Sequence, residues 1–267
     1  MTWQLTEDVE EFRRAADSWL SRDPARNTVL LTVSESLRGD GVPGAAVAPA
    51  LFGWWRESEN APVSGAFIQT PPQPPGLGPM SARAAAELAG ALRASGRPVP
   101  GVRGERKSAA AFAEEWTGGV VRAEGPGGSV GMRLFRLGAL TPPRPAPRGR
   151  ARLADTEDTA RAAEWMSAFA ADIGEPAGTD YTAATARRIE EGRLLLWEAE
   201  GLPVSMAGRT PLVAGQIRIA PVSGLSRRPR RARDDSYGAS PRCRNSRIRP
   251  VFGRPSALRC TASDAAR

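Results

Sequence analysis

The stretch RLLLWEAEGLPVSMAGRTPLVAGQIRIAPV, residues 193–222, carries the clearest structural pattern in the chain. It contains three short runs rich in apolar residues, at 193–199, 203–209 and 215–222, and a short segment with glycine or proline separates each run from the next. Connections of this kind join neighbouring antiparallel strands. We therefore expect residues 193–222 to form a three-stranded antiparallel meander.

The residues before this meander predict one strand and two helices. Residues 151–174 read as a strand followed by a helix, with Asp155 as the N-cap. A second, shorter helix is expected within 179–192, because Gly192 stands where a glycine commonly ends a helix. The order over 151–222 is therefore β-α-α-β-β-β. The longer helix has one apolar face, which consists of Ala162, Trp165, Met166, Phe169 and Ile173.

The N-terminal half has a related succession of elements. We expect an amphipathic helix over 4–20, strands over 28–38, 50–57 and 63–71, helices over 81–95 and 107–116, and a strand over 130–140. Residues 141–150, TPPRPAPRGR, contain four prolines and read as a linker. These patterns predict an N-terminal domain over 1–140, the linker, a second domain over 151–222 and a tail over 223–267.

The positive charge of the chain is confined to the tail. The formal net charge is +8, but residues 223–267 hold twelve arginines and three aspartates, which leaves −1 on residues 1–222. An arginine-rich segment can bind phosphate backbones. A non-catalytic protein whose basic tail binds nucleic acid or another polyanion is therefore the alternative function that the composition leaves open.

Several classes of chemistry are excluded by residue content. The chain has no histidine, which removes histidine-dependent triads and histidine-based metal sites, and no metal site is expected. Both cysteines, Cys243 and Cys260, lie in the tail, so residues 1–222 can form no disulfide. The start is acidic and amphipathic, and no apolar run approaches the ~18 residues of a membrane span. We expect a soluble, cytoplasmic protein with no membrane partner.

Isolated motifs in the chain favour structural rather than catalytic interpretations. VSMAG (204–208) lacks the first glycine of a nucleophile elbow and has no histidine to activate Ser205, so this serine reads as a strand residue. RAEGPGGSVG (122–131) lacks the lysine of a phosphate loop and reads as a hairpin turn. Trp54 and Trp55 read as core residues. Four carboxylates could supply a general base, but charges in solvent at a helix end are the favoured interpretation: Glu190, Glu191, Glu198 and Glu200.

The segment WEAEGLPVSMAGRTPLVAGQIRIAPV (197–222) resembles the central strands of the GNAT superfamily of acyl-CoA-dependent N-acyltransferases. It is especially similar to two-part actinobacterial members with a GNAT-like N-terminal half. RLFRLGALTPP (133–143) resembles the junction between the halves of such proteins. The resemblance covers residues 1–222 and is strongest over 150–222. It implies an α/β (α+β) fold, with a mixed, largely antiparallel sheet and flanking helices in two halves.

The resemblance also implies a cofactor site at the end of the meander. In that family the strand ending at Val222 splays from its neighbour, and the pantetheine of acyl-CoA lies in the gap. Acetyl-CoA is thus expected as co-substrate and an amine as acceptor, with cofactor contacts through the backbone of Ala220, Pro221 and Val222. The family continues with a Gln/Arg-x-x-Gly-x-Gly/Ala loop that binds the CoA pyrophosphate at a helix N-terminus.

No such loop pattern follows Val222 in this chain. The favoured explanation is a truncation or frameshift in the gene, because GC-rich DNA read in an unselected frame gives strings rich in Arg, Ser, Pro and Ala. The second domain is then incomplete, the tail 223–267 is expected to be disordered, and acetyl-CoA binding is expected to be weak. No catalytic acid or base can be assigned from the sequence.

Overall fold

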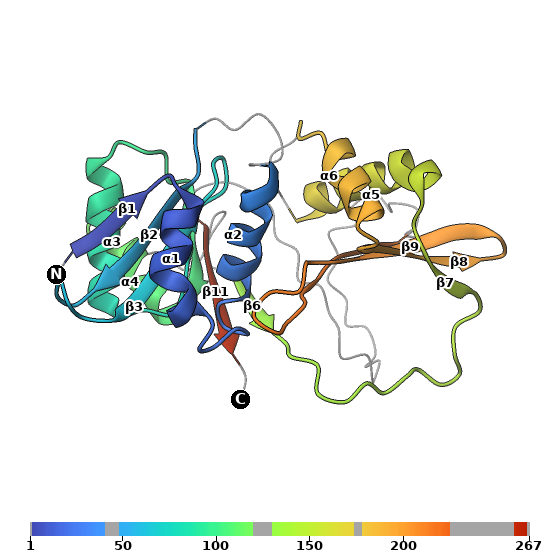
Figure 1. The fold of residues 1–267 in the computed structure, drawn as a ribbon, viewed down its shortest axis with the longest axis horizontal. Coiled ribbons are helices and arrows are strands. Elements are labelled where there is room, and N and C mark those ends of the chain that lie inside the picture. Colours follow the sequence, from blue (N-terminus) through green and yellow to red (C-terminus); the bar gives the residue numbers. More distant parts are fainter. Residues whose placement is uncertain (1, 41–47, 120–129, 174–177, 225–258, 266–267) are drawn as a thin grey trace, which may run out of the picture.

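The computed structural model describes residues 2–40, 48–119, 130–173, 178–224 and 259–265 (Figure 1). Over these ranges the chain is a mixed α/β protein with six α-helices and two sheets, a mixed one of seven strands and an antiparallel one of four. The mixed α/β class expected from the sequence is therefore confirmed. The two sheets lie in different parts of the molecule, and each has its own helices.

The seven-stranded sheet belongs mainly to the N-terminal half. Its elements are β1 (Thr2–Thr6), α1 (Val9–Leu20), α2 (Thr28–Asp40), β2 (Leu51–Arg56), β3 (Val63–Gln69), β4 (Gly76–Leu77), α3 (Ala82–Ala94), β5 (Gly101–Glu105), α4 (Arg106–Thr117) and β6 (Val130–Leu134). β1 to β4 form an antiparallel meander, and β5 runs parallel to β4. β11 (Arg259–Ala265) lies between β5 and β6, parallel to both.

The four-stranded sheet belongs to the C-terminal half. Its elements are β7 (Arg150–Leu153), the 3₁₀ turn η1 (Thr156–Asp158), α5 (Thr159–Asp172), α6 (Thr182–Glu190), β8 (Leu194–Ala199), β9 (Leu202–Arg209) and β10 (Ile219–Gly224). The strand order β10-β9-β8-β7 is antiparallel throughout, and β8, β9 and β10 form the meander that the sequence predicts. Asp155 caps η1 by accepting a hydrogen bond from the backbone N–H of Glu157, and Gly192 follows α6 with a φ of 62°.

Two expectations for the N-terminal half are wrong. The first helix does not begin at residue 4, because residues 2–6 pair with β2 as a strand and Asp8 caps the helix from Val9 onwards. Residues 28–38, expected as a strand, lie in α2. Within this helix Leu30, Leu31 and Ser34 are buried, which is the three- and four-residue spacing of one helix face.

The strand expected over 130–140 is shorter in the structure. β6 ends at Leu134, where β11, its one partner among the described strands, also ends, and Phe135, Leu137 and Leu140 are exposed. The segment from there to Gly149 forms no helix or strand and is exposed throughout, as expected of a linker.

The tail has more structure than expected at its two ends. β10 extends to Gly224, and 259–265 form β11, because the backbone groups of β5 and β6 pair with this strand on both sides. Residues 225–258, which include most of the tail, lie outside the described residues, as does the turn expected over 122–131 up to residue 129. The division into domains stays a prediction.

Trp54 and Trp55 are core residues, as predicted. Their exposed fractions are 5% and 0%, and they lie on β2 with their side chains on opposite faces of the sheet. Trp54 packs in a cluster with Phe12 of α1, and Trp55 lies 5.7 Å from Trp3 of β1, measured between ring centroids. Apolar clusters therefore fill both faces of the N-terminal sheet.

The C-terminal sheet is covered by helices on one face (Figure 1). Leu194, Leu196 and Met206 on that face are buried with residues of α5 and α6. On the opposite face the strand register aligns one residue from each strand in a row: Leu153, Leu195, Ala207 and Val222. The two ends of this row are open, since Leu153 is 57% exposed and Val222 is 61% exposed. We call these four residues the open row.

The two halves touch through the connection between β9 and β10. Val213 and Gln216 form an isolated bridge around a turn at Ala214 and Gly215, both with positive φ as a type I′ turn requires. Val213 is 7% exposed and packs in the cluster of Phe12 in the N-terminal half. The Nε2 of Gln216 donates to the carbonyl oxygen of Pro24 at 2.5 Å. A hairpin of the C-terminal half therefore docks on the N-terminal half.

Candidate functional site

The residues expected to contact a cofactor lie at a bulge in β10. Ile219 pairs with Arg209 and Val222 pairs with Ala207, so Ala220 and Pro221 together face the single residue Gly208 of β9. A bulge bends a strand and alters its twist, and bulges are frequent beside functional sites. The bulge therefore displaces β10 from β9 at the position where the family resemblance implies cofactor contacts.

Only glycine fits opposite this bulge. A Cβ at Gly208 would stand 2.9 Å from the carbonyl oxygen of Ala220 and 3.1 Å from Cδ of Pro221. A Cβ atom essentially never lies within 3.0 Å of a non-bonded heavy atom, so a larger residue would push β10 away from β9. The glycine in PVSMAG therefore allows the two strands to approach closely.

β10 is at the edge of the four-stranded sheet within the described residues. None of the described strands pairs with its second edge, and an unpaired strand edge can bind a ligand or another strand. Pro221 is buried, Ala220 is half-buried and Val222 is exposed on the open row. The loop that the family pattern would place after Val222 falls after Gly224, outside the described residues. Cofactor contacts of Ala220, Pro221 and Val222 stay a prediction.

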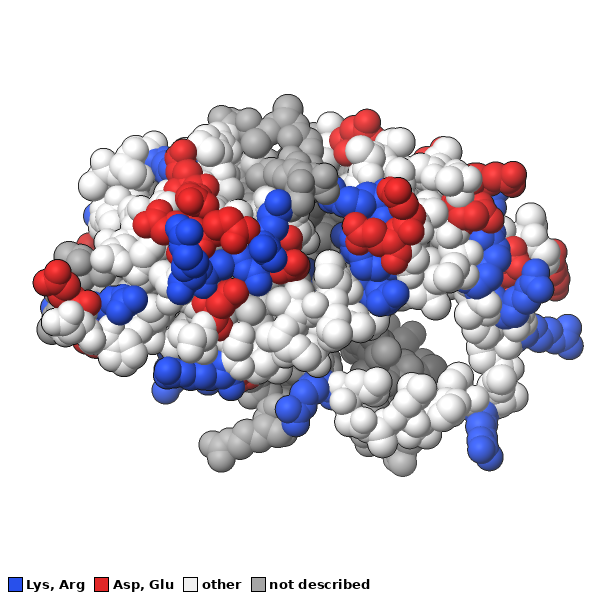
Figure 2. Space-filling model, in the orientation of Figure 1, with Lys and Arg blue, Asp and Glu red and all other residues white. Residues whose placement is uncertain are grey.

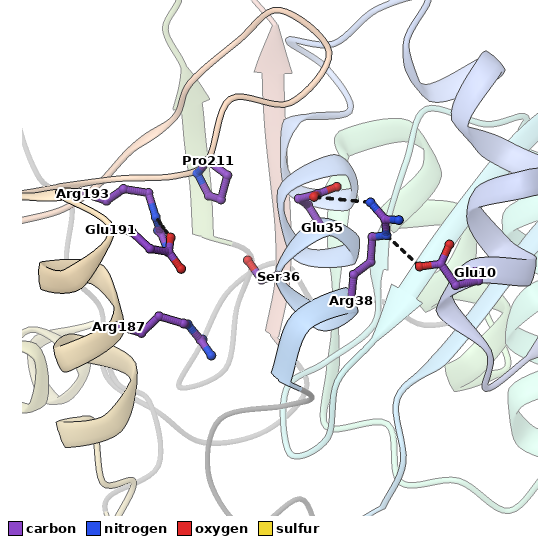
Figure 3. A pocket seen from close by; sticks show the side chains of 8 residues that line it. All are labelled: Glu10, Glu35, Ser36, Arg38, Arg187, Glu191, Arg193 and Pro211. Atoms are coloured by element: carbon purple, nitrogen blue, oxygen red, sulfur yellow. Dashed lines mark hydrogen bonds and ion pairs between the residues drawn. The ribbon is translucent and has the colours of Figure 1, made fainter.

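A polar pocket of about 420 Å³ lies between the two halves (Figure 3). One wall comes from α1 and α2, with Glu10, Glu35, Ser36 and Arg38. The other wall comes from the end of α6, the start of β8 and the loop after β9, with Arg187, Glu191, Arg193 and Pro211. On the face shown in Figure 2, positive and negative side chains gather over α1 and α2 and also near α6.

The wall from the N-terminal half is held by a chain of ion pairs. Arg38 donates from Nε to Glu10 at 2.7 Å and lies 3.6 Å from Glu35. Arg13, behind the wall, pairs with Glu35 and with Asp17. The hydrogen bond to Glu10 is the main reason that the pKa of Arg38 lies above its usual range. All acidic groups of this wall are therefore engaged with arginines.

The wall from the C-terminal half is richer in arginine. Glu191 pairs with Arg193, whose hydrogen bond lowers the pKa of that carboxyl. Arg193 also donates from Nη1 to the backbone carbonyl of Arg209 at 3.2 Å, and Arg209 donates from Nη2 to the carbonyl of Gly192 at 3.3 Å. The bonds to Glu191 and to the Arg209 carbonyl hold the Arg193 guanidinium in the wall of the pocket.

The four carboxylates considered as general bases do not converge. Glu198 accepts hydrogen bonds from Arg152 at 2.7 Å and from Arg150 at 3.1 Å, which lower its pKa. Glu191 is paired as described above, whereas Glu190 and Glu200 are exposed. A carboxylate with a lowered pKa is a weaker base, so Glu191 and Glu198 are poorly suited to proton abstraction. Ser205 lies within β9, as the structural interpretation predicts.

Among the described residues, no group of three or more Asp, Glu or Cys side chains is arranged to hold a metal ion. None of the described helices combines the length and apolar character needed to cross a membrane. Compared with known proteins, the chain matches no family model, no curated protein and no solved structure.

Proposed function

We propose that the chain has the two-part architecture of a GNAT-type N-acyltransferase and that its C-terminal half carries an incomplete acetyl-CoA site. The observation that carries this proposal is a repeated order of elements. The N-terminal half begins β1-α1-α2-β2-β3-β4, and the C-terminal half runs β7-α5-α6-β8-β9-β10. In both, the four strands are neighbours in chain order and antiparallel.

The fourth strand of each half supports the same assignment. In the N-terminal half β4 pairs with β5 at a single position, Gly76 with Arg103, and α3 begins soon afterwards with Ser81 as N-cap. A strand that barely pairs with its neighbour and leads into a helix is the arrangement that the family resemblance implies for cofactor binding. In the C-terminal half the corresponding strand β10 has the bulge at Ala220 and Pro221, and no described strand pairs with its second edge.

The proposed reaction is direct acyl transfer. The nitrogen of an amine attacks the thioester carbonyl of acetyl-CoA, the resulting oxyanion collapses, and the C–S bond breaks. The nitrogen loses a proton as the amide forms, and the departing CoA thiolate takes up a proton. A backbone N–H of β10 would polarise the carbonyl and stabilise the oxyanion. Ala220 and Val222 can supply such an N–H, whereas Pro221 cannot. No described side chain is assigned as acid or base.

The exposed apolar residues of the open row support the proposal that the C-terminal half is incomplete. Leu153 and Val222 expose aliphatic surface on a sheet face for which no described helix supplies cover. Contiguous apolar surface is uncommon on a complete soluble domain. A domain whose remaining helices and strands are missing would leave such a face.

Binding measurements with two ligands test the proposal. Acetyl-CoA and acetyl-pantetheine share the acyl and pantetheine groups, but only acetyl-CoA has the pyrophosphate. Loss of two hydrogen bonds to that charged group, at about 1.5–3 kcal/mol each, removes two to four powers of ten in affinity. We therefore expect calorimetry to give similar, weak affinities for the two ligands, within about tenfold of each other.

Two other outcomes have different meanings. A preference for acetyl-CoA of more than a hundredfold would show a complete pyrophosphate site and overturn the incomplete state. Binding of neither ligand at millimolar concentration would overturn the assignment of β10 as a cofactor strand. The coding DNA around codon 222, read in all three frames, tests the frameshift independently.

A further inference from the structure

Arginines from three separate segments meet at one end of the four-stranded sheet. Arg187 and Arg188 lie in the last turn of α6, Arg193 directly precedes β8, and Arg218 directly precedes β10. Arg209 at the end of β9 donates its backbone N–H to the carbonyl of Arg193 at 2.9 Å. The next backbone N–H, that of residue 210, donates to the carbonyl of Arg218 at 2.9 Å. The antiparallel register thus brings Arg193 and Arg218 to either side of β9.

Two of these guanidinium groups have no carboxylate partner among the described residues. Arg188 makes one side-chain contact, from Nη1 to the Sδ of Met166 at 3.6 Å. The Nε of Arg218 is buried and has no hydrogen-bond partner. Glu191 pairs with Arg193, so it does not neutralise either of them. Positive charge therefore exceeds negative charge at this end of the sheet.

This excess is unfavourable in the unliganded protein. Burial lowers the pKa of Arg188, and repulsion from Arg193, Arg218 and Arg187 lowers it further. Burial also lowers the pKa of Arg218. Buried charges are normally paired, because an unpaired one loses its hydration without compensation. Perturbed groups of this kind cluster at functional sites.

The pocket between the halves gives this charge an accessible position. Arg187 and Arg193 line it beside Glu191, which pairs with Arg193. The opposite wall contributes Ser36 and Arg38 together with Glu10 and Glu35, both of which pair with arginines (Figure 3). A volume of about 420 Å³ lies in the usual range for small-molecule sites. Guanidinium groups bind carboxylates and phosphates through two parallel hydrogen bonds.

We propose that this pocket binds the oxyanion of a small molecule, a phosphate or carboxylate group, at Arg187 and Arg193, with Arg188 and Arg218 behind them supplying the attractive potential. The site lies at the opposite end of β10 from the position expected for the CoA pyrophosphate. The inference therefore does not depend on the acyltransferase proposal, and either can fail without the other.

Thermal unfolding and calorimetry with simple anions test this site in the full chain. Inorganic phosphate and succinate are added at constant ionic strength, with sodium chloride as the reference. We expect one of them to raise the Tm above the chloride reference and to bind with a measurable Kd. Stronger binding of phosphate assigns a phosphoryl group, and stronger binding of succinate assigns a carboxylate. The absence of any effect beyond chloride would overturn the proposal.

Variants separate an anion site from a structural role of the arginines. Arg218→Met and Arg188→Met keep most of the side-chain volume, and each should weaken anion binding at least tenfold. Without anion their Tm should equal or exceed that of the parent chain, because repulsion is removed. The matched control is Arg83→Met on α3, an exposed arginine paired with Glu87. The proposal would be contradicted if Arg218→Met lowered the Tm in chloride and left the phosphate response unchanged. Arg218→Lys keeps the charge, so it should retain most of the anion binding.

Discussion

Arg152 joins three elements of the C-terminal half through one side chain. Its Nη1 and Nη2 donate to the carboxylate of Asp158 in η1 at 2.5 and 2.9 Å, and its Nε donates to Glu198 of β8 at 2.7 Å. Asp158 is 8% exposed and also accepts the backbone N–H of Asp155 at 2.9 Å. Two-pronged bonds of this type combine charge with fixed geometry.

This arrangement predicts a defined pH dependence of stability. Hydrogen bonds from Arg152 lower the pKa of Asp158 and of Glu198. Their contribution is therefore complete above the ordinary carboxyl pKa of about 4 and is lost as the pH falls below it. Arg152→Met should lower the free energy of unfolding at pH 7 by about 1.5–3 kcal/mol and by much less near pH 3.

Urea unfolding at several pH values between 7 and 3 measures this difference. Arg150→Met is the matched control, since the Arg150 side chain is 79% exposed and an exposed pair contributes about 0–1 kcal/mol. If Arg152→Met lowered the free energy of unfolding equally at every pH, the loss would come from packing and not from the ionic hydrogen bonds.

The pairing of β9 with β10 depends on the absence of a side chain at Gly208. Gly208→Ala places a methyl group against the backbone of the bulge, so we expect the free energy of unfolding to fall by about 1–3 kcal/mol. Acetyl-pantetheine binding should also weaken, because the strand that would carry it is displaced. Gly90→Ala is the control: it lies within α3, its Cβ would meet no atom within 4 Å, and it should stabilise the protein by about 1 kcal/mol. Equal effects of the two substitutions would show that β10 is free to shift.

Local sequence patterns predict most of the helices and strands of the C-terminal half. In the N-terminal half they wrongly predict a strand where the structure has α2. Caps and turns depend on only a few neighbouring residues. The cap at Asp155, the helix end at Gly192 and the strands of the meander can therefore be predicted from local sequence alone. Thr28, Val29 and their neighbours favour a strand by propensity, yet packing of one face on the N-terminal core makes them helical. Intrinsic preferences of about 1 kcal/mol are small beside burial of several side chains.

The candidate pocket could not be predicted from the sequence. Its walls come from 10–38 and 187–211, and no local spacing connects these segments. Arg193, Arg209 and Arg218 stand at the ends of apolar strands, and their convergence follows only from the strand register. The bulge at Ala220 and Pro221 likewise depends on pairing with Gly208.

The relative position of the two halves depends on the hairpin at 213–216. Val213→Asp would place a charge in the cluster of Phe12, so we expect the free energy of unfolding to fall by about 2–4 kcal/mol and the halves to separate. The radius of gyration from small-angle X-ray scattering should rise, and the phosphate response of the pocket should weaken although Val213 is not among its lining residues.

Leu212 provides the matched control for this experiment. It precedes Val213 in the chain but is 69% exposed, so Leu212→Asp should leave the scattering and the phosphate response unchanged. If the two variants behave alike, the hairpin does not hold the halves together.

The exposed linker and the docked hairpin join the same two bodies at separate points. A short tether keeps the partners at an effective concentration in the millimolar range, and the prolines of 141–149 limit how far they can drift. A hairpin contact that would be too weak to hold free halves can therefore keep them associated for most of the time. Brief release of the hairpin would open the pocket to solvent without dispersing its walls, so ligand exchange and reclosure become first-order events within one molecule.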